Sequence, residues 1–572
     1  MDGLCHSDHT PSRGLVELRK IYEPIEAVLD GQDLVVHNHY DFIGLEHVRA
    51  EYNAQEHGER FVLPCLRFRQ SYGTIPDEFV HSSNLIAAGV LAIPLVSPGE
   101  QGRIHLPQDI FKHEGAHERY LTVTFRLKRD TPWANAGQMI AWFQSPLRAL
   151  ATDPAPSHAS TISSKHGSNS GTPTSTPASS SKPSLTFSAT SLEYKICNSS
   201  TTVTFDRVRG QLSSLIHNSN PLLADTRVES HNPASPSPLL SLDFWRPPTD
   251  NDNAWQSDEW KRYGLHMMTS RLKSFKACVR SSLTTSTSIH ASLANGSVEV
   301  SAVTLEAEHA LSPPSQAWHF NAMTTYTIST VSSPGSGSSD PNSTPSAAGT
   351  QTGLTIQIHT RLIPRGSHPD NLPRVGHSIQ LAPEYKHVKW FGRGPLESYN
   401  DKYLSQQMGI WQCNIDDMAE HYEVPQENGN RCDVRWCTVA AAISADADPT
   451  IVTGDDGGEE AGRDVAGGKR TPVPTSRFPV LRATYLPGTP KRDSPHMQFS
   501  TQLYDAATVE MAKHPCDLLE PGKRRKGALW RLDADVAGVG TAACGPSTEE
   551  EDQVLCRQRE WTLVLQVLPK LV

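Results

Sequence analysis

Hydrophobic and polar positions divide the chain into strand-like segments separated by long polar stretches. In residues 120–127 apolar and polar side chains alternate, as they do in a strand that buries one face. Helical patterns are few, and residues 258–272 form the best of them. Other short segments combine β-branched and aromatic residues in a way that favours strands: 34–36, 61–63, 185–187, 192–196, 202–205, 354–358 and 561–567.

Three stretches contain almost no large apolar side chains. Residues 151–184 and 331–350 are rich in Ser, Thr and Pro, and residues 444–476 are rich in Asp, Gly, Glu and Pro. Such segments bury too little apolar surface to offset the entropy lost on ordering. The pattern therefore predicts one β-sandwich of about 120 residues, a linker, and a larger all-β domain with disordered insertions.

Composition narrows the class of protein. The chain has 572 residues, which predicts two to four domains, and a net charge of −10, which argues against nucleic acid as the main partner. No apolar run reaches the roughly 18 residues of a membrane span, and residues 1–10 lack the charged and apolar parts of a signal peptide. With only ten Cys, we expect reduced thiols and a cytoplasmic location.

One motif resembles a zinc-protease site. His113, Glu114 and His117 match the H-E-x-x-H pattern, in which two His on one helix face bind zinc and the Glu acts as a base. Gly115 interrupts the motif, and a predicted strand begins shortly after it. A polar loop is the favoured interpretation, with zinc binding as the alternative.

Three other motifs have structural interpretations that we favour. Residues 250–253 suggest calcium binding, but they lack the Gly and the distant Glu of an EF-hand, so an Asx-rich turn is predicted. Cys432 and Cys437 form one pair, whereas structural zinc needs four ligands, so core or edge thiols are predicted. The basic residues 523–526 are interpreted as a solvated hairpin tip rather than a targeting patch.

No catalytic constellation is visible from pattern alone, but seven blocks occur in an order typical of one enzyme family. Together they resemble the C-terminal half of the glycoside hydrolase family 2 β-galactosidases. The blocks are residues 1–15, 38–46 (NHYDFIGLE), 131–142, 244–252 (FWRPPTDND), 388–395 (VKWFGRGP) with Glu397, Tyr399 and Asp401, 422–429 (YEVPQENG) with Arg431, and 538–546 with Cys544.

The resemblance implies an all-β fold class: an immunoglobulin-like β-sandwich followed by a large galactose-mutarotase-like supersandwich with low-complexity insertions. It implies the C-terminal end of a catalytic (β/α)8 barrel at 1–20 and the immunoglobulin-like sandwich at 21–148. A disordered linker at 149–184 and the β-galactosidase small-chain domain at 185–572 follow, the latter with disordered insertions at 331–350 and 444–476.

The resemblance also implies that the catalytic residues lie outside this chain. In the family, two glutamates of the barrel act as acid/base and nucleophile, and retention requires their carboxyls to be about 5–5.5 Å apart. The magnesium and the sodium or potassium of the family are likewise expected in the barrel, so no cofactor is expected on this chain alone. Met1 falls on a methionine inside a family motif, which indicates a truncated gene prediction or a split gene.

Two residues carry implied site roles. Asp2 matches the family residue that lies beside the sugar and a monovalent cation, and a frayed terminus is the alternative. Cys544 matches a residue on a C-terminal loop that reaches the substrate, and an inert thiol is the alternative. Some members have Trp at the position of Cys544, and a thiol offers less stacking area. Residues 391–395 and 422–429 are interpreted as packing and turn positions.

The sequence therefore supports a main hypothesis and an alternative. The first is the C-terminal portion of a retaining β-galactosidase, inactive alone, with galactosides such as lactose as substrate. Its partners would be the missing barrel half or a large subunit, and a second copy in a homo-oligomer. The alternative is a non-catalytic carbohydrate-binding or scaffold protein derived from such an enzyme.

Overall fold

The structure is a computed structural model. It describes residues 4–57, 80–81, 84–111, 117–147, 185–224, 239–280, 297–332, 352–441, 478–487, 496–540 and 548–568. The predicted strand at 61–63, most of the H-E-x-x-H motif (113–116) and the low-complexity stretch 151–184 lie outside the described residues. So do nearly all of 331–350 and the whole of 444–476.

The chain divides into two compact units. One comprises Pro24–Gly58 and Leu85–Pro183, and the other comprises Met1–Glu23, Glu59–Asn84 and Ser184–Val572. The second unit therefore includes the N-terminal segment, which the resemblance assigns to the end of a barrel.

The smaller unit contains a three-stranded and a four-stranded sheet. Leu34 and Val36 of the first sheet and Val123 and Phe125 of the second are fully buried in one common core, so the two sheets form a sandwich. Their strands are β1 (Ile25–Asp30), β2 (Asp33–Asn38) and β6 (Gln101–His105), then β5 (Asn84–Leu91), β3 (Val48–His57), β7 (Glu118–Leu127) and β8 (Met139–Pro146), with short 3-10 turns at Leu45–His47 and Gln108–Ile110.

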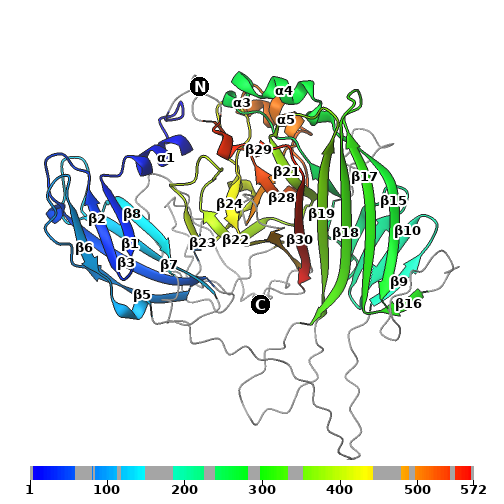
Figure 1. The fold of residues 1–572 in the computed structure, drawn as a ribbon, viewed down its shortest axis with the longest axis horizontal. Coiled ribbons are helices and arrows are strands. Elements are labelled where there is room, and N and C mark those ends of the chain that lie inside the picture. Colours follow the sequence, from blue (N-terminus) through cyan, green and yellow to red (C-terminus); the bar gives the residue numbers. More distant parts are fainter. Residues whose placement is uncertain are drawn as a thin grey trace, which may run out of the picture. The chain divides into compact units, whose positions relative to one another are not determined.

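A ten-stranded antiparallel sheet dominates the larger unit. Its long strands lie side by side in Figure 1. In sheet order they are β15 (Thr269–Arg280), β17 (Ala302–Ser312), β18 (His319–Ser332), β19 (Thr352–Arg365), β30 (Arg559–Leu568), β26 (Val480–Pro487), β25 (Trp436–Ala440), β22 (His387–Gly394), β23 (Gln407–Asn414) and β4 (Val80–His81).

Three further sheets complete the larger unit. The six-stranded sheet contains β13 (Asn220–Pro221), β12 (Gln211–His217), β11 (Thr201–Asp206), β10 (Glu193–Cys197), β9 (Leu185–Ala189) and β16 (Ser297–Val300). The five-stranded sheet contains β14 (Leu240–Asp243), β21 (Arg374–Gln380), β28 (Leu529–Val536), β27 (Met497–Gln502) and β24 (Arg431–Val434). The third is the pair β20 (Asn371–Leu372) and β29 (Val554–Leu555).

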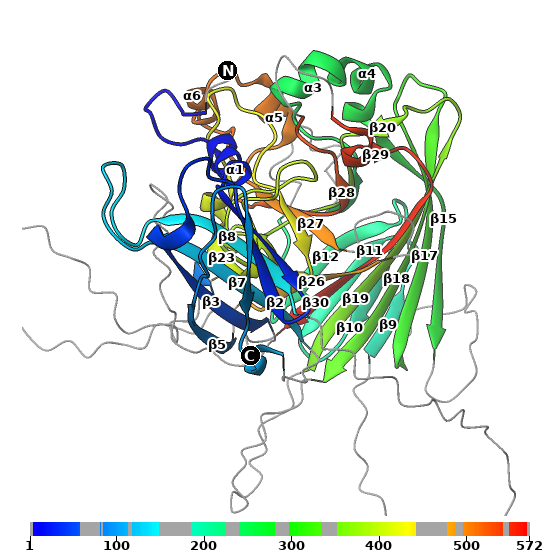
Figure 2. The same cartoon turned by 60° about the vertical axis from the view of Figure 1, so that its left-hand side comes forward.

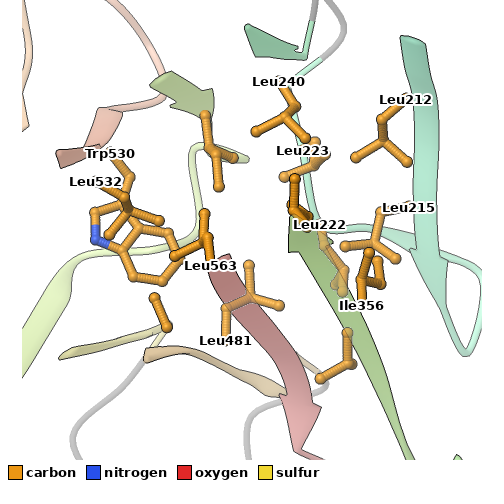
Figure 3. Packing of buried hydrophobic residues seen from close by; sticks show 14 of the residues in the cluster. Leu212, Leu215, Leu222, Leu223, Leu240, Ile356, Leu481, Trp530, Leu532 and Leu563 are labelled. Atoms are coloured by element: carbon orange, nitrogen blue, oxygen red, sulfur yellow. The ribbon is translucent and has the colours of Figure 1, made fainter. Parts of the chain in front are cut away.

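One hydrophobic core connects the three large sheets. Leu215 of β12, Ile356 of β19, Trp530 of β28 and Leu563 of β30 are all buried in it, and Figure 3 shows these side chains within a single packed region. Burial of this apolar surface is the main favourable term in folding. The all-β prediction is thus confirmed, including its strands at 120–127, 354–358 and 561–567.

The helices are short and lie outside the sheets. In both cartoon views α3, α4 and α5 gather at one end of the larger unit (Figure 1, Figure 2). The helices are α1 (Arg13–Ile21), α3 (Asp250–Trp255), α4 (Ser257–Arg262), α5 (Ala506–Met511) and α6 (Pro515–Leu518), with 3-10 turns at Leu265–Met267, Ile415–Met418 and Glu550–Asp552. No helix of the described ranges is long and apolar enough to cross a membrane.

Two local predictions were wrong. The helix expected at 258–272 ends at Arg262, because Thr269–Leu272 pair with β17 as the start of β15. The turn expected at 250–253 is the first part of α3. Thr249 accepts a hydrogen bond from the Asp252 amide, and the Asp252 carboxylate accepts one from the Thr249 amide. This reciprocal capping box stabilises a helix start.

The two other motifs with structural interpretations lie in described residues. Cys432 and Cys437 are buried thiols on β24 and β25, as predicted for core cysteines. Residues 523–526 lie in the connection between the paired strands β27 and β28, which also contains α5 and α6. There the exposed Arg524 forms an ion pair with Asp416.

Candidate functional site

The two site residues predicted from the sequence, Asp2 and Cys544, both lie outside the described residues. Their roles therefore stay predictions. The chain on either side of Cys544 is described up to Gly540 and again from Thr548, and the chain after Asp2 is described from Leu4. The contacts of these flanking segments show how the larger unit holds the approaches to both residues.

A buried arginine fixes the chain that leads into the Cys544 loop. Arg246 is fully buried and binds the Asp252 carboxylate, with Nη2 2.8 Å from Oδ1 and 2.9 Å from Oδ2. Its guanidinium also donates to the carbonyl oxygens of Ala537 and, at 2.8 Å, Gly538. The positive charge of Arg246 is neutralised by the Asp252 carboxylate. The remaining N–H donors of the guanidinium hold backbone carbonyls that are far away in sequence.

Asn251 and Asp401 hold the next two residues of the same segment. The Asn251 amide donates to the carbonyl of Val539 at 2.9 Å. The Asp401 carboxylate accepts from the amides of Val539 at 3.0 Å and Gly540 at 2.8 Å. We call Arg246, Asn251, Asp252 and Asp401 the loop anchor.

Glycine is required where the segment passes the loop anchor. Gly540 has a φ of +93°, and a Cβ there would lie 2.5 Å from the Cβ of Asn251. At Gly538, a Cβ would lie 2.5 Å from Oδ2 of Asp401. Larger residues would push the segment off its hydrogen bonds.

The carboxylates around this segment have raised pKa values. Burial raises the pKa of Asp401 and outweighs the opposing effect of the Val539 and Gly540 amides. Burial, together with the charges of Asp401 and Glu551, raises the pKa of Asp552 to about 6. The backbone carbonyl of Asp552 accepts from the Gly538 amide at 2.9 Å, so a group that titrates near pH 6 flanks the loop.

Glu397 joins two of the motif blocks. Its carboxylate accepts from Lys402 Nζ at 2.7 Å, from the Tyr422 hydroxyl, and from the Gly429 amide at 2.9 Å. Burial alone would raise its pKa, but these partners outweigh burial and lower the pKa to about 2. A carboxylate that stays ionised and fully engaged is poorly suited to general acid catalysis, so Glu397 is a positioning residue.

The N-terminal segment binds to the same part of the larger unit. Glu17 of α1 accepts from the amides of Leu404 at 2.7 Å and Ser405 at 3.1 Å. Arg13 forms an ion pair with Glu420. The Ser7 amide donates to Glu423 at 2.9 Å. Helix α1 is thus tied to the loop that also carries Glu397 and Asp401, and Ser7 and Arg13 are tied to the loop that carries Glu420 and Glu423.

Sequence reasoning missed the loop anchor. Asp401 and residues 246–252 belong to the blocks of the resemblance, but no role was assigned to them. The T-x-x-D spacing of Thr249 and Asp252 signals a capped helix. Nothing in the local sequence signals that Arg246 binds Ala537 and Gly538 or that Asn251 binds Val539. In the described part of the chain, no group of three or more His, Cys, Asp or Glu side chains has the arrangement of a metal site.

Comparisons with known proteins cover both units. The family "Beta galactosidase small chain" matches residues 197–565, and "Beta-galactosidase, domain 4" matches residues 34–148. A β-galactosidase of Kluyveromyces lactis is 24% identical over 553 residues, which are 96% of this chain and 38% of the relative. A β-galactosidase of Priestia megaterium is 22% identical over 77% of this chain and 32% of the relative.

A shorter match is closer in sequence: a β-galactosidase of Psychromonas ingrahamii is 47% identical over 64 residues, which are 11% of this chain. The chain thus spans about a third of the length of the two relatives that match most of it. These findings confirm the resemblance to the C-terminal portion of β-galactosidases. Because one family description covers residues 197–565, more than half of the chain, the chain belongs to the β-galactosidase small-chain family.

Proposed function

We propose that this chain is the C-terminal portion of a cytoplasmic β-galactosidase that hydrolyses terminal non-reducing β-D-galactosides such as lactose. The bond-breaking glutamates, and the magnesium and sodium or potassium sites of the family, belong in this proposal to a barrel outside this chain. The barrel is either joined ahead of Met1 or supplied by a large subunit, and the assembled enzyme forms a homo-oligomer.

The observation that carries the proposal is the loop anchor. Arg246, Asn251 and Asp401, far from it in sequence, bond directly to Ala537–Gly540, the segment that leads into the Cys544 loop, and Asp252 holds Arg246 in place. Holding a binding loop in place before substrate arrives lowers the entropy lost on binding. Such a construction is expected for a loop that must meet a sugar held in another part of the enzyme.

Each of the two predicted site residues has a defined part in the proposal. Cys544 contacts the galactoside through its loop. Asp2 lies beside the sugar, where its carboxylate would supply an oxygen ligand to a monovalent cation. The retaining reaction itself takes place between two barrel carboxyls about 5–5.5 Å apart.

Substitution of Cys544 tests the sugar contact directly. In a polypeptide that carries the barrel ahead of this chain, Cys544→Trp should lower KM for a galactoside by about three- to tenfold, since an indole offers more stacking area. Cys516→Trp is the matched control, because Cys516 is an exposed thiol on α6. An unchanged KM in Cys544→Trp would show that the loop does not reach the substrate.

A further inference from the structure

A polar cleft of about 850 Å³ opens in the larger unit beside the loop anchor. Asn400, the neighbour of Asp401, lines it together with Tyr403, Gln498, Asp535 and Arg559. Ligand pockets typically measure about 300–1,000 Å³ and contain a few convergent polar groups. This cleft has the size of a small-ligand site, and none of the four loop-anchor side chains is among the residues that line it.

Four of the side chains that line the cleft form one connected hydrogen-bond network. The Gln498 amide donates to Asn400 Oδ1 at 2.9 Å and to Asp535 Oδ1 at 3.4 Å. Asn400 Nδ2 donates to Asp535 Oδ1 at 3.2 Å, and Arg559 Nη1 donates to Asp535 Oδ2 at 3.3 Å. Gln498, Asp535 and Arg559 are all buried and bond within this network, so they fix Asn400, its partly accessible member, before a ligand enters.

The aromatic ring of Tyr403 lines the same cleft. The Arg393 guanidinium lies 4.4 Å from the centre of the Tyr403 ring, and Arg393 is itself held by Asp433 at 2.5 Å. These contacts fix the ring without covering it completely, since Tyr403 remains partly accessible. An immobilised aromatic ring offers apolar contact area at low entropic cost.

The charges that line the cleft disfavour an anionic ligand. The lining includes five carboxylates, on Asp433, Asp535 and Glu549–Glu551, and three guanidinium groups, on Arg393, Arg557 and Arg559. The excess of negative charge repels phosphates and carboxylates. A neutral molecule with hydroxyls that both donate and accept fits the fixed network best.

We propose that this cleft binds a neutral mono- or disaccharide, with a hydroxyl on Asn400, which Gln498 and Asp535 hold in place, and an apolar sugar face on Tyr403. The site belongs to this chain's own side chains and is independent of the barrel that the proposed function requires.

Calorimetric titration of the purified chain with lactose, galactose and maltose tests the proposal. Saturable binding is expected for at least one of them, with Kd on the order of 1 mM. Tyr403→Ala and Asn400→Ala should each weaken this binding about tenfold or more. Leu404→Ala, a change at the exposed neighbour of Tyr403, should leave it unchanged. Thermal unfolding of each variant verifies that it is folded. Because there are two independent cleft variants, the binding test still gives a result if one of them fails to fold.

Three outcomes overturn the proposal: no saturable binding by the wild-type chain, equal binding by the wild type and both cleft variants, or loss of binding in Cys544→Ala alone. The last result would assign the sugar to the loop of the proposed function instead. Conversely, sugar binding that depends on Tyr403 and Asn400, together with an unchanged KM in Cys544→Trp, would refute the loop contact and support the cleft site. The two proposals therefore fail separately.

Discussion

Arg246 and Glu397 are the two side chains on which most of the site geometry depends. Both are buried ions, and both bind backbone or side chains from separate motif blocks. An ion taken out of water is costly unless every partner is present. The presence of Arg246 and Glu397 in the motif blocks is therefore explained by their protein partners.

Removal of the Arg246 partner should destabilise the larger unit strongly. Asp252→Ala leaves a buried guanidinium without its carboxylate, which should cost about 3–5 kcal/mol of unfolding free energy. Glu259→Ala is the matched control on the next helix, because Glu259 and Arg262 are 42% and 73% exposed and lie 3.8 Å apart. Its cost should stay within about 0.5 kcal/mol. Urea unfolding followed by tryptophan fluorescence measures both, and equal values for the two variants would refute the role of the pair.

Glu397 should contribute an acid-sensitive part of the stability. The pKa of a glutamate side chain is ordinarily 4.5, and for Glu397 it falls to about 2 in the folded chain, so folding favours the ionised form. The contribution, roughly 3 kcal/mol, is fully present above pH 4.5 and is lost as the pH falls toward 2. The stability difference between the wild type and Glu397→Gln should therefore shrink across that range. A difference that does not change with pH would contradict this assignment.

At the scale of elements, local patterns predicted strands better than helices. Residues 354–358 and 561–567 have the β-branched content of strands, and they pair with each other as β19 and β30. Residues 269–272 carry a helical pattern, but pairing with β17 outweighs it. The loop anchor could not be predicted at this scale, because Asn251 and Val539 are 288 residues apart and only the completed fold brings them together.

The loop anchor requires glycine at position 540. Gly540→Ala should loosen Ala537–Gly540, because the new Cβ would meet Asn251 and the φ of +93° is strained for alanine. Gly522→Ala is the matched control: its φ is +85°, but no atom lies within 4 Å of the added Cβ. Amide hydrogen exchange should accelerate at residues 537–540 in the first variant only. The same exchange rate in both variants would indicate strain alone and no anchor.

The contact of α1 with the larger unit depends on Glu17. Glu17→Ala removes the acceptor for the Leu404 and Ser405 amides, so residues 4–22 should exchange amide hydrogens at least about tenfold faster, corresponding to ~1.4 kcal/mol. The exposed Glu259→Ala again serves as the control. Unchanged protection of residues 4–22 would mean that other contacts suffice to hold the segment.

At the scale of the whole molecule, the chain combines two all-β units with segments that lead to two predicted site residues. The seven motif blocks anticipated the family and the β-rich fold because they are local and occur in order. The roles of individual residues in these blocks could not be predicted in the same way, because Asp401 and Arg246 form hydrogen bonds to the backbone of segments that are distant in sequence. In the proposed function this chain is a supporting half, and its loop anchor would act only together with a catalytic barrel.

Hydrolysis of a chromogenic β-galactoside is the measurement that tests this central claim most directly. The purified chain alone should show no turnover above buffer, while the same chain joined to a barrel region encoded in the same genome should hydrolyse the substrate. Replacement of either barrel glutamate in the joined polypeptide should abolish that activity. Turnover by the chain alone, or an inactive joined polypeptide that is folded, would contradict the account.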